Sequence, residues 1–222
     1  MKDVLRQTAE TLRQALAARL VPPAEFRSAL LAVPPTERDA WLDVVFDLHD
    51  VAEDGALLPR GCVPYLPTAV DDVLRAMELA QVGPGDVILD VGSGLGRAAL
   101  LMQLLTGAVT IGIEIQPALA QASRRLAARV HGSRFAVVEG DAAEPSPHLV
   151  LGNVFFLYCP FGGARLTRLL GRLEALSRAR PIRVCCVDLP LPGCPWLEPV
   201  SFDGGALAVY RSARASTAAA TS

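Results

Sequence analysis

Hydrophobic residues recur at every third or fourth position through much of the first fifty residues, which is the spacing of amphipathic helices. Two proline pairs, Pro22-Pro23 and Pro34-Pro35, interrupt this pattern, and proline ends a helix because it lacks an amide proton. Thr36 follows the second pair and can cap the next helix. The predicted helices span residues 4–20, 24–33 and 36–48. We interpret residues 1–60 as an N-terminal helical extension, which either forms a lid over the site or only covers the sheet.

The pattern changes after Pro67, where short apolar runs alternate with amphipathic stretches. Thr68 and Asp71 match a capping box for a helix that reaches Gln81. Further helices are predicted at 95–105, 117–130 and 164–179, and strands at 87–91, 109–115, 134–139, 149–158 and 182–189. These strands are apolar on both faces, as buried parallel strands are. The alternation of strand and helix therefore predicts an α/β fold with a doubly wound, mostly parallel sheet.

Two more strands are predicted at 197–202 and 206–211. The proline-rich segment 190–195 that leads to them is shorter than the roughly dozen residues that a parallel crossover needs. Asp203-Gly204-Gly205 is typical of a hairpin turn. The sheet is therefore expected to end in an antiparallel hairpin, within a Rossmann-like domain over 61–212 that precedes a flexible tail at 213–222.

Composition supports a packed core, because 51% of the 222 residues are hydrophobic and 20% are charged. The formal net charge of −2 gives no general attraction to nucleic acids or acidic membranes. The five cysteines are odd in number and contain no C-x-x-C pair, so we expect reduced thiols, no metal site and a cytoplasmic protein. The first residues lack the apolar run of a signal peptide, and no segment approaches a membrane span of about 18 residues.

The most informative segment, residues 87–97, runs from an apolar strand into Asp90 and then into glycines at alternate positions. Glycine lets the chain turn tightly and lets a ligand approach the backbone. The spacing G-x-G-x-G differs from the G-x-G-x-x-G of dinucleotide-binding folds. Asp90 would repel a pyrophosphate, whereas it would attract the sulfonium and ammonium groups of S-adenosyl-L-methionine. The segment therefore favours S-adenosyl-L-methionine as the cofactor.

Two more acidic residues follow the next two strands. Glu114 lies at the end of the strand at 109–115, where an acid reaches the ribose hydroxyls in this type of sheet. Asp141 follows the strand at 134–139 and could accept a hydrogen bond from the adenine amino group. Since the carboxyl ends of parallel strands meet at one edge of the sheet, the three acids fit one site.

Residues 87–97, the segment 112–115 and the turn 139–141 together resemble the class I S-adenosylmethionine-dependent methyltransferases, over roughly residues 65–211. The resemblance implies that three groups of residues bind the cofactor. These are Asp90, Gly92, Ser93, Gly94 and Gly96 at the methionine end, Glu114 and Ile115 at the ribose, and Asp141 and Ala142 at the adenine.

The segment Tyr65-Leu66-Pro67-Thr68 before the glycine motif resembles the front of the protein-lysine methyltransferases with this fold, including the nucleosomal histone type. This second resemblance implies that Tyr65 and Thr68 cover the cofactor. The alternative is a proline turn followed by a helix cap. The chain lacks the basic tail expected of a nucleosome-binding protein, which argues against a histone substrate.

The acceptor end of the site is expected after the strand at 149–158. Many members of this class carry a polar-Pro-Pro-aromatic motif there, and the nearest equivalent is Tyr158-Cys159-Pro160-Phe161. Tyr158 replaces the usual Asn or Asp, which argues against an adenine or glutamine amine as the acceptor. Methyl transfer depends mainly on alignment, and a general base matters only when the nucleophile starts protonated. Tyr158 and His49, with Asp50 beside it, are the candidates for that role.

These observations predict an enzyme that transfers the methyl group of S-adenosyl-L-methionine to a small molecule or a protein side chain. Two alternatives remain open from the sequence. One is a catalytically silent cofactor-binding scaffold for a partner protein, which the altered Tyr158 segment suggests. The other is a nicotinamide-dependent oxidoreductase, which the glycine spacing and Asp90 oppose. We expect neither a nucleic acid nor a membrane as a partner.

Overall fold

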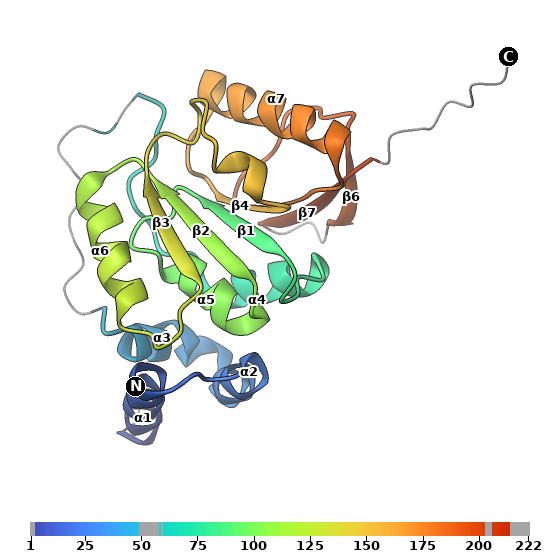
Figure 1. The fold of residues 1–222 in the computed structure, drawn as a ribbon. Helices are drawn as coiled ribbons and strands as arrows, with labels where there is room; N and C mark the ends of the chain where they lie inside the picture. The colour runs from blue at the N-terminus through green and yellow to red at the C-terminus, as the bar shows by residue number, and fades with distance from the viewer. Residues whose placement is uncertain (1–2, 49–57, 59, 203–205, 214–222) are drawn as a thin grey trace, which may run out of the picture.

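A computed structural model describes residues 3–48, 58, 60–202 and 206–213, and its centre is a seven-stranded sheet (Figure 1). The strands are β1 Val87–Val91, β2 Val109–Glu114, β3 Phe135–Glu139, β4 Val154–Tyr158, β5 Arg183–Val187, β6 Leu197–Phe202 and β7 Leu207–Ser212. Their order in the sheet is β3-β2-β1-β4-β5-β7-β6. Strands β1 to β5 are parallel, whereas β7 is antiparallel to both β5 and β6. The predicted α/β fold, doubly wound and ending in an antiparallel pair, is confirmed.

Helices cover both faces of this sheet. They are α1 Asp3–Ala18, α2 Pro23–Leu31, α3 Arg38–Phe46, α4 Val70–Leu79, α5 Arg97–Thr106, α6 Pro117–Ala128 and α7 Gly163–Ala179. Helix α7 lies on one face, and α4, α5 and α6 lie on the other (Figure 1). Helices α1 to α3 form a further layer outside α5 (Figure 1). Among the described helices, none is long and apolar enough to cross a membrane.

Alternate residues of each central strand enter two different cores. Leu89 and Phe155 pack towards α7, whereas Ile88 and Phe156 pack towards α4 and α5. The second core continues outward into the N-terminal helices, where Trp41 is 1% exposed. Removal of apolar surface from water drives this packing, so α1 to α3 are part of the fold rather than an appendage to it.

Two predicted helix caps are wrong, and a tertiary contact replaces one of them. Helix α4 begins at Val70 and receives no cap from the Thr68 side chain. Instead, the Val70 N–H donates a hydrogen bond of 3.1 Å to Asp39 Oδ1 of helix α3. Thr36 lies within a short 3-10 turn, Pro35–Glu37, and does not cap α3. An acid from another helix can satisfy the first amide groups as well as a local side chain can.

The strand predicted at 149–158 is wrong in its first half. Leu149–Leu151 forms a 3-10 turn, and the strand begins only at Val154. Gly152 approaches the sheet closely, because an added Cβ would lie 2.4 Å from Leu89 Cδ1. The Asn153 side chain then binds the amino end of β1, accepting the Val87 N–H at 2.9 Å and donating to Asp86 at 2.8 Å. A continuous apolar run does not reveal such a break.

Two other expectations lie outside the described residues. These are the hairpin turn at 203–205 and most of the tail, 214–222. The division of the chain at residue 60 stays a prediction.

Candidate functional site

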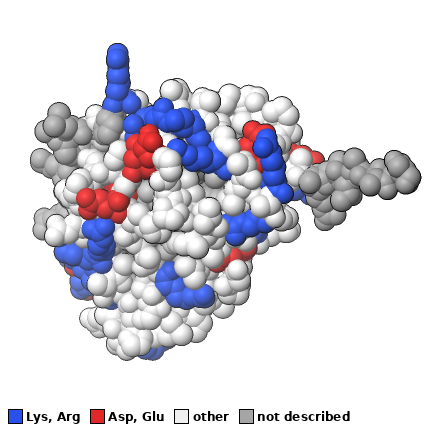
Figure 2. Space-filling view, turned by 45° about the horizontal axis from the view of Figure 1, so that its top comes forward, with Lys and Arg blue, Asp and Glu red and all other residues white. Residues whose placement is uncertain are grey.

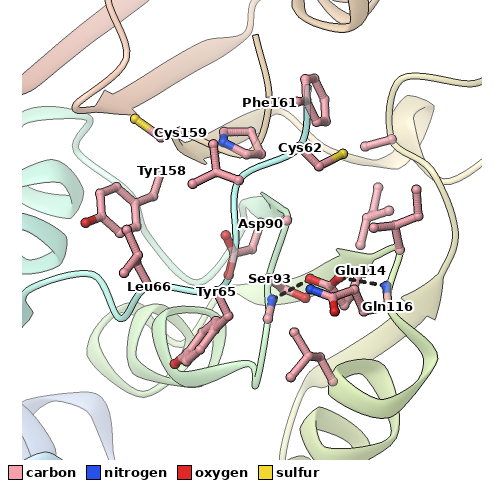
Figure 3. Close-up of a pocket in the computed structure, with 18 of the residues that line it drawn as sticks. Cys62, Tyr65, Leu66, Asp90, Ser93, Glu114, Gln116, Tyr158, Cys159 and Phe161 are labelled. Atoms are coloured by element: carbon pink, nitrogen blue, oxygen red, sulfur yellow. Dashed lines mark hydrogen bonds between the residues drawn. The ribbon is translucent and has the colours of Figure 1, made fainter. Parts of the chain in front are cut away.

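A cavity of about 300 Å³ opens at the carboxyl ends of β1, β2 and β4 (Figure 3). The segment 62–66 crosses over it, and the glycine turn after β1 lies beneath this segment (Figure 3). The predicted residues that line the cavity are Tyr65, Thr68, Asp90, Gly92, Ser93, Gly94, Glu114, Ile115, Asp141, Ala142 and Tyr158. Predicted residues from five separate stretches of sequence therefore meet at one site.

Two predicted site residues differ from this pattern. Gly96 does not line the cavity; an added Cβ there would lie 2.2 Å from Ser123 Oγ and 2.7 Å from the Phe135 ring. Gly96 therefore allows α5 to begin close against α6 and β3, and its expected cofactor contact stays a prediction. His49 lies outside the described residues, as does Asp50.

The glycine turn is shaped to receive an aromatic ring. Gly94 has a φ of 52°, and an added Cβ would lie 2.2 Å from a ring carbon of Tyr65. No other residue leaves this space open, so Gly94 lets Tyr65 close over the turn. Burial raises the pKa of Tyr65 to about 12, which keeps the phenol neutral. Tyr65 is therefore an uncharged cover for one side of the cavity.

Asp90 is the most unusual group in the site. Its side chain is 3% exposed, and Oδ2 has no hydrogen-bond partner among the described residues. Burial, together with the nearby charge of Glu114, raises the pKa of Asp90 to about 7. A buried carboxylate oxygen without a partner is costly for a folded protein, so Oδ2 points to a ligand that supplies the missing partner. A sulfonium or ammonium group fits this requirement, whereas a phosphate does not.

Glu114 accepts hydrogen bonds from two loops beside Asp90. Oε2 accepts the Gly94 N–H at 2.7 Å, and Oε1 accepts the Gln116 N–H at 2.8 Å (Figure 3). The carboxylate is therefore fixed in direction and faces the cavity. Each carboxylate oxygen has a second lone pair and can also accept a hydroxyl hydrogen bond. The proposed ribose contact is compatible with this geometry and stays a prediction.

Asp141 is oriented by two partners. Oδ1 accepts the Ala143 N–H at 2.8 Å, and Oδ2 forms an ion pair with Arg165. Arg165 also lies over the Phe161 ring, 5.7 Å from its centroid. Sequence reasoning missed Arg165, because its partners become neighbours only when α7 packs beside the β3 end. The role of Asp141 at an adenine amino group stays a prediction.

Arg97 is a second residue that sequence reasoning missed. Its side chain is 4% exposed, and Nη1 donates to the Thr68 carbonyl at 2.8 Å. The same guanidinium donates to Asp39 Oδ1 at 2.9 Å and to Asp43 Oδ1 at 2.7 Å, both on α3. A basic residue is unfavourable in the first turn of a helix, because the helix dipole is positive there. The sequence signal that could have revealed this role is the position of Arg97, directly after the last glycine of the turn.

The far end of the cavity is formed by the ends of β4 and β5. Tyr158 and Cys159 lie on the side away from Glu114 (Figure 3). The Cys159 thiol donates to the Asp188 carbonyl, and both residues have positive φ, 39° and 50°. Burial, and then the charge of Asp188, raises the pKa of Tyr158. The predicted acceptor end thus contains a neutral phenol and an acid that the sequence analysis did not single out.

The described N-terminal helices do not line the cavity themselves. Residues of α1 to α3 are absent from the cavity lining, which among the described residues begins at Leu58. Instead, α3 holds the covering segment from behind through Arg97 and the Thr68 carbonyl. Helices α1 to α3 pack on α4, α5 and one another, and the choice between a lid and a covering layer stays a prediction.

The sheet order, the antiparallel β7 and the acid-flanked glycine turn after β1 define a class I S-adenosylmethionine-dependent methyltransferase fold. A sequence model of the family "Protein-L-isoaspartate(D-aspartate) O-methyltransferase" matches residues 32–148, more than half of the chain. The chain belongs to this family. Its cofactor is S-adenosyl-L-methionine, as the sequence indicated.

The chain is also similar to solved structures and to curated proteins outside this family. An RNA methyltransferase from Salinibacter ruber, in complex with S-adenosyl-L-homocysteine, is 27% identical, with a TM-score of 0.50, over 66% of this chain and 92% of that chain. The yhhF protein of Escherichia coli is 22% identical, with a TM-score of 0.50, over 70% of this chain and 90% of that chain, and shows the fold. The ribosomal protein L11 methyltransferase of Ralstonia pickettii is 36% identical over 74 residues, 33% of this chain. The chain spans about a quarter of the length of that relative, 25%. The likeness to lysine methyltransferases stays a prediction.

Proposed function

We propose that the protein transfers the methyl group of S-adenosyl-L-methionine to a nucleophile on a protein side chain or a small molecule. The observation that carries the proposal is the buried Asp90 carboxylate beside the glycine turn, whose Oδ2 has no hydrogen-bond partner among the described residues. When bound, the cofactor supplies a methyl group activated by a sulfonium. The work of the chain is to bind and orient the reactants and to exclude water.

The lining residues divide this work between them. Asp90 attracts positive charge, and Glu114 fixes the glycine turn. Asp141 and Arg165 shape the opposite end. Tyr65 closes over Gly94 and limits access of water to the reacting groups.

Tyr158 suits a positioning role better than a basic one. Its raised pKa keeps the phenol protonated at neutral pH, so the hydroxyl can donate and accept hydrogen bonds but is a poor proton acceptor. Asp188, which lines the same end of the cavity, is the better candidate to receive a proton. The candidate role of His49 stays a prediction.

The acceptors of the relatives define which substrates to test. Their names point to an isoaspartyl residue, a ribosomal protein and an RNA. An RNA is the least suited of these to the surface, since basic side chains lie beside acidic ones on the face in Figure 2. Arg168 and Glu144, for example, form an ion pair of 3.5 Å.

Calorimetric titration tests the cofactor part of the proposal. The folded protein is expected to bind S-adenosyl-L-methionine and S-adenosyl-L-homocysteine and not NAD. Asp90→Ala and Glu114→Ala should each weaken binding by at least about tenfold, or about 1.4 kcal/mol. Glu139→Ala is the matched control, because Glu139 is the register partner of Glu114 on β3 but does not line the cavity.

Turnover separates an enzyme from a silent scaffold. Formation of S-adenosyl-L-homocysteine should depend on an added acceptor from the panel above. Unchanged cofactor affinity in folded Asp90 and Glu114 variants would contradict the assigned site. Binding without turnover for any acceptor class would favour the scaffold.

A further inference from the structure

Three arginines of helix α7 hold the loop that follows β3. Arg165, Arg168 and Arg172 recur at helical spacing, so they lie on one face of α7. Arg168 pairs with Glu144 at 3.5 Å, and Arg172 donates to a backbone carbonyl of the same loop. Arg165 pairs with Asp141, and of these three described arginines it alone lines the cavity. Its contact is therefore the one that can affect a bound ligand.

The stability of the fold does not explain the position of Arg165. It is the third residue of α7, where a cation lies near the positive end of the helix dipole. The side chains of Arg165 and Asp141 are only 15% and 21% exposed, so their pairing removes both charges from most of the water. Such a pair stabilises a protein only when its other polar atoms are also satisfied. Arg165 Nε is buried and has no hydrogen-bond partner among the described residues.

The pair does fix the direction of the Asp141 carboxylate. Oδ1 accepts the Ala143 N–H at 2.8 Å, and Oδ2 accepts the Arg165 guanidinium. Two donors on different oxygens hold the plane of the carboxylate, whereas one donor would leave it free to tilt. Each oxygen keeps a second lone pair, so the group can accept one more hydrogen bond in a set direction.

Arg165 is itself held by the segments around it. Its guanidinium lies over the Phe161 ring, 5.7 Å from the centroid, and a Cβ added to Gly61 would lie 3.9 Å from its Cδ. Phe161 in turn forms an antiparallel bridge with Cys62, at the start of the segment that covers the cavity. Arg165 thus packs between this segment, the end of β4 and the loop after β3, and its planar guanidinium is oriented before a ligand binds.

We infer that Arg165 is a positioning residue that makes the cofactor end of the cavity selective for adenine over bases that lack the 6-amino group. The inference rests on the proposed function and on the predicted contact of Asp141 with adenine. The ion pair offsets the charge of Asp141 and leaves an acceptor that is aimed at a neutral amino donor. Hypoxanthine has an oxygen in place of this amino group, and two acceptors that face each other leave both unsatisfied.

Calorimetry with two nucleosides tests the inference. The protein is titrated with S-adenosyl-L-homocysteine and with S-inosyl-L-homocysteine, in which the 6-amino group is replaced by an oxygen, and the ratio of the two Kd values is measured. The wild type should bind the adenosyl compound at least about tenfold more tightly. Arg165→Met should lower this ratio by at least about threefold, whereas Arg165→Lys, which keeps a charged donor, should retain most of it.

The ratio separates positioning from a structural role, because a general loss of structure weakens both nucleosides alike. Arg168→Met is the matched control and should leave the ratio unchanged, since Arg168 pairs with an acid of the same loop but does not line the cavity. Asp141→Asn can donate to the 6-oxygen, so it should also lower the ratio, and adding Arg165→Met should lower it no further.

Three results would overturn the inference. They are a wild-type ratio near one, a wild-type ratio in folded Arg165→Met, and a loss of the same size in Arg168→Met. If Arg165→Met does not fold, a folded Asp141→Asn variant with the wild-type ratio overturns the inference in its place. Failure of both nucleosides to bind the wild type would instead refute the proposed function.

Discussion

Replacing Asp90 by asparagine keeps the shape of the buried side chain and removes its charge. The carboxyl group in the free protein has a pKa of about 7, because burial and the charge of Glu114 disfavour ionisation. If a cationic cofactor binds only the ionised form, its apparent affinity falls with the ionised fraction. That fraction is about nine-tenths at pH 8 and about one-tenth at pH 6, so the wild-type Kd should rise about tenfold between them.

Calorimetry with S-adenosyl-L-methionine at pH 6, 7 and 8 measures this dependence. The Asp90→Asn variant should bind more weakly at pH 8 and should lose most of the slope between pH 6 and 8. Glu139→Ala should keep the wild-type slope, since Glu139 does not line the cavity. A wild-type affinity that is flat with pH, or an equal slope in the asparagine variant, would refute the reasoning.

Stability supplies the complementary measurement. A carboxyl pKa raised by folding stabilises the protein below the unfolded pKa of about 4, and this contribution is lost as the pH rises through 7. Without cofactor, Asp90→Asn should therefore be more stable than the wild type at pH 8, with the advantage shrinking towards pH 4. Thermal unfolding of both proteins at pH 8 and pH 4 tests whether the asparagine variant is the more stable one only at the higher pH.

Three further outcomes are expected. Gly94→Ala should weaken S-adenosyl-L-homocysteine binding more than tenfold by calorimetry, because the added Cβ would lie 2.2 Å from the Tyr65 ring. Gly83→Ala is the control and should leave the affinity unchanged, because a Cβ added there has no atom within 4 Å. Arg97→Met should lower the free energy of unfolding, measured with urea, by about 2 kcal/mol. This loss is smaller than for a fully buried ion pair, because Asp39 and Asp43 are half exposed. A loss near zero would show that these contacts do not stabilise the fold. Burial would raise the pKa of Asp86, but hydrogen bonds from Gly83, Asn153 and Arg183 outweigh it and hold the pKa below its ordinary value. Its stabilising effect is therefore present above pH 4 and lost as the pH falls below it, so thermal unfolding of Asp86→Asn should depend less on pH between 3 and 6 than that of the wild type.

Features encoded by local patterns were predictable from the sequence. The bounds of β1 were predicted to the residue, because its apolar run is enclosed by Asp86 and the glycine turn. The acids Asp90, Glu114 and Asp141 converge because parallel strands present their carboxyl ends at one edge. Strand periodicity and glycine spacing were sufficient for both conclusions.

Features that depend on long-range partners were not predictable in this way. Asp39 caps a helix that begins 31 residues later, and Arg165 pairs with an acid 24 residues earlier. Gly96 shares the spacing of the two preceding glycines, yet it packs between α6 and β3 rather than facing the cavity. The spacing of the glycines predicts the turn, but it does not predict which of them face the cavity and which pack against neighbouring elements.

Asp39 has a practical consequence, because a single carboxylate both receives Arg97 and completes the first turn of α4. A shortened gene that starts at residue 61 would delete this group together with Trp41, and it would expose the apolar underside of α5 to solvent. The methyltransferase core should then aggregate on expression instead of yielding a smaller working enzyme. Affinity tags and fusion partners should accordingly be joined before residue 3 and not at the apparent boundary.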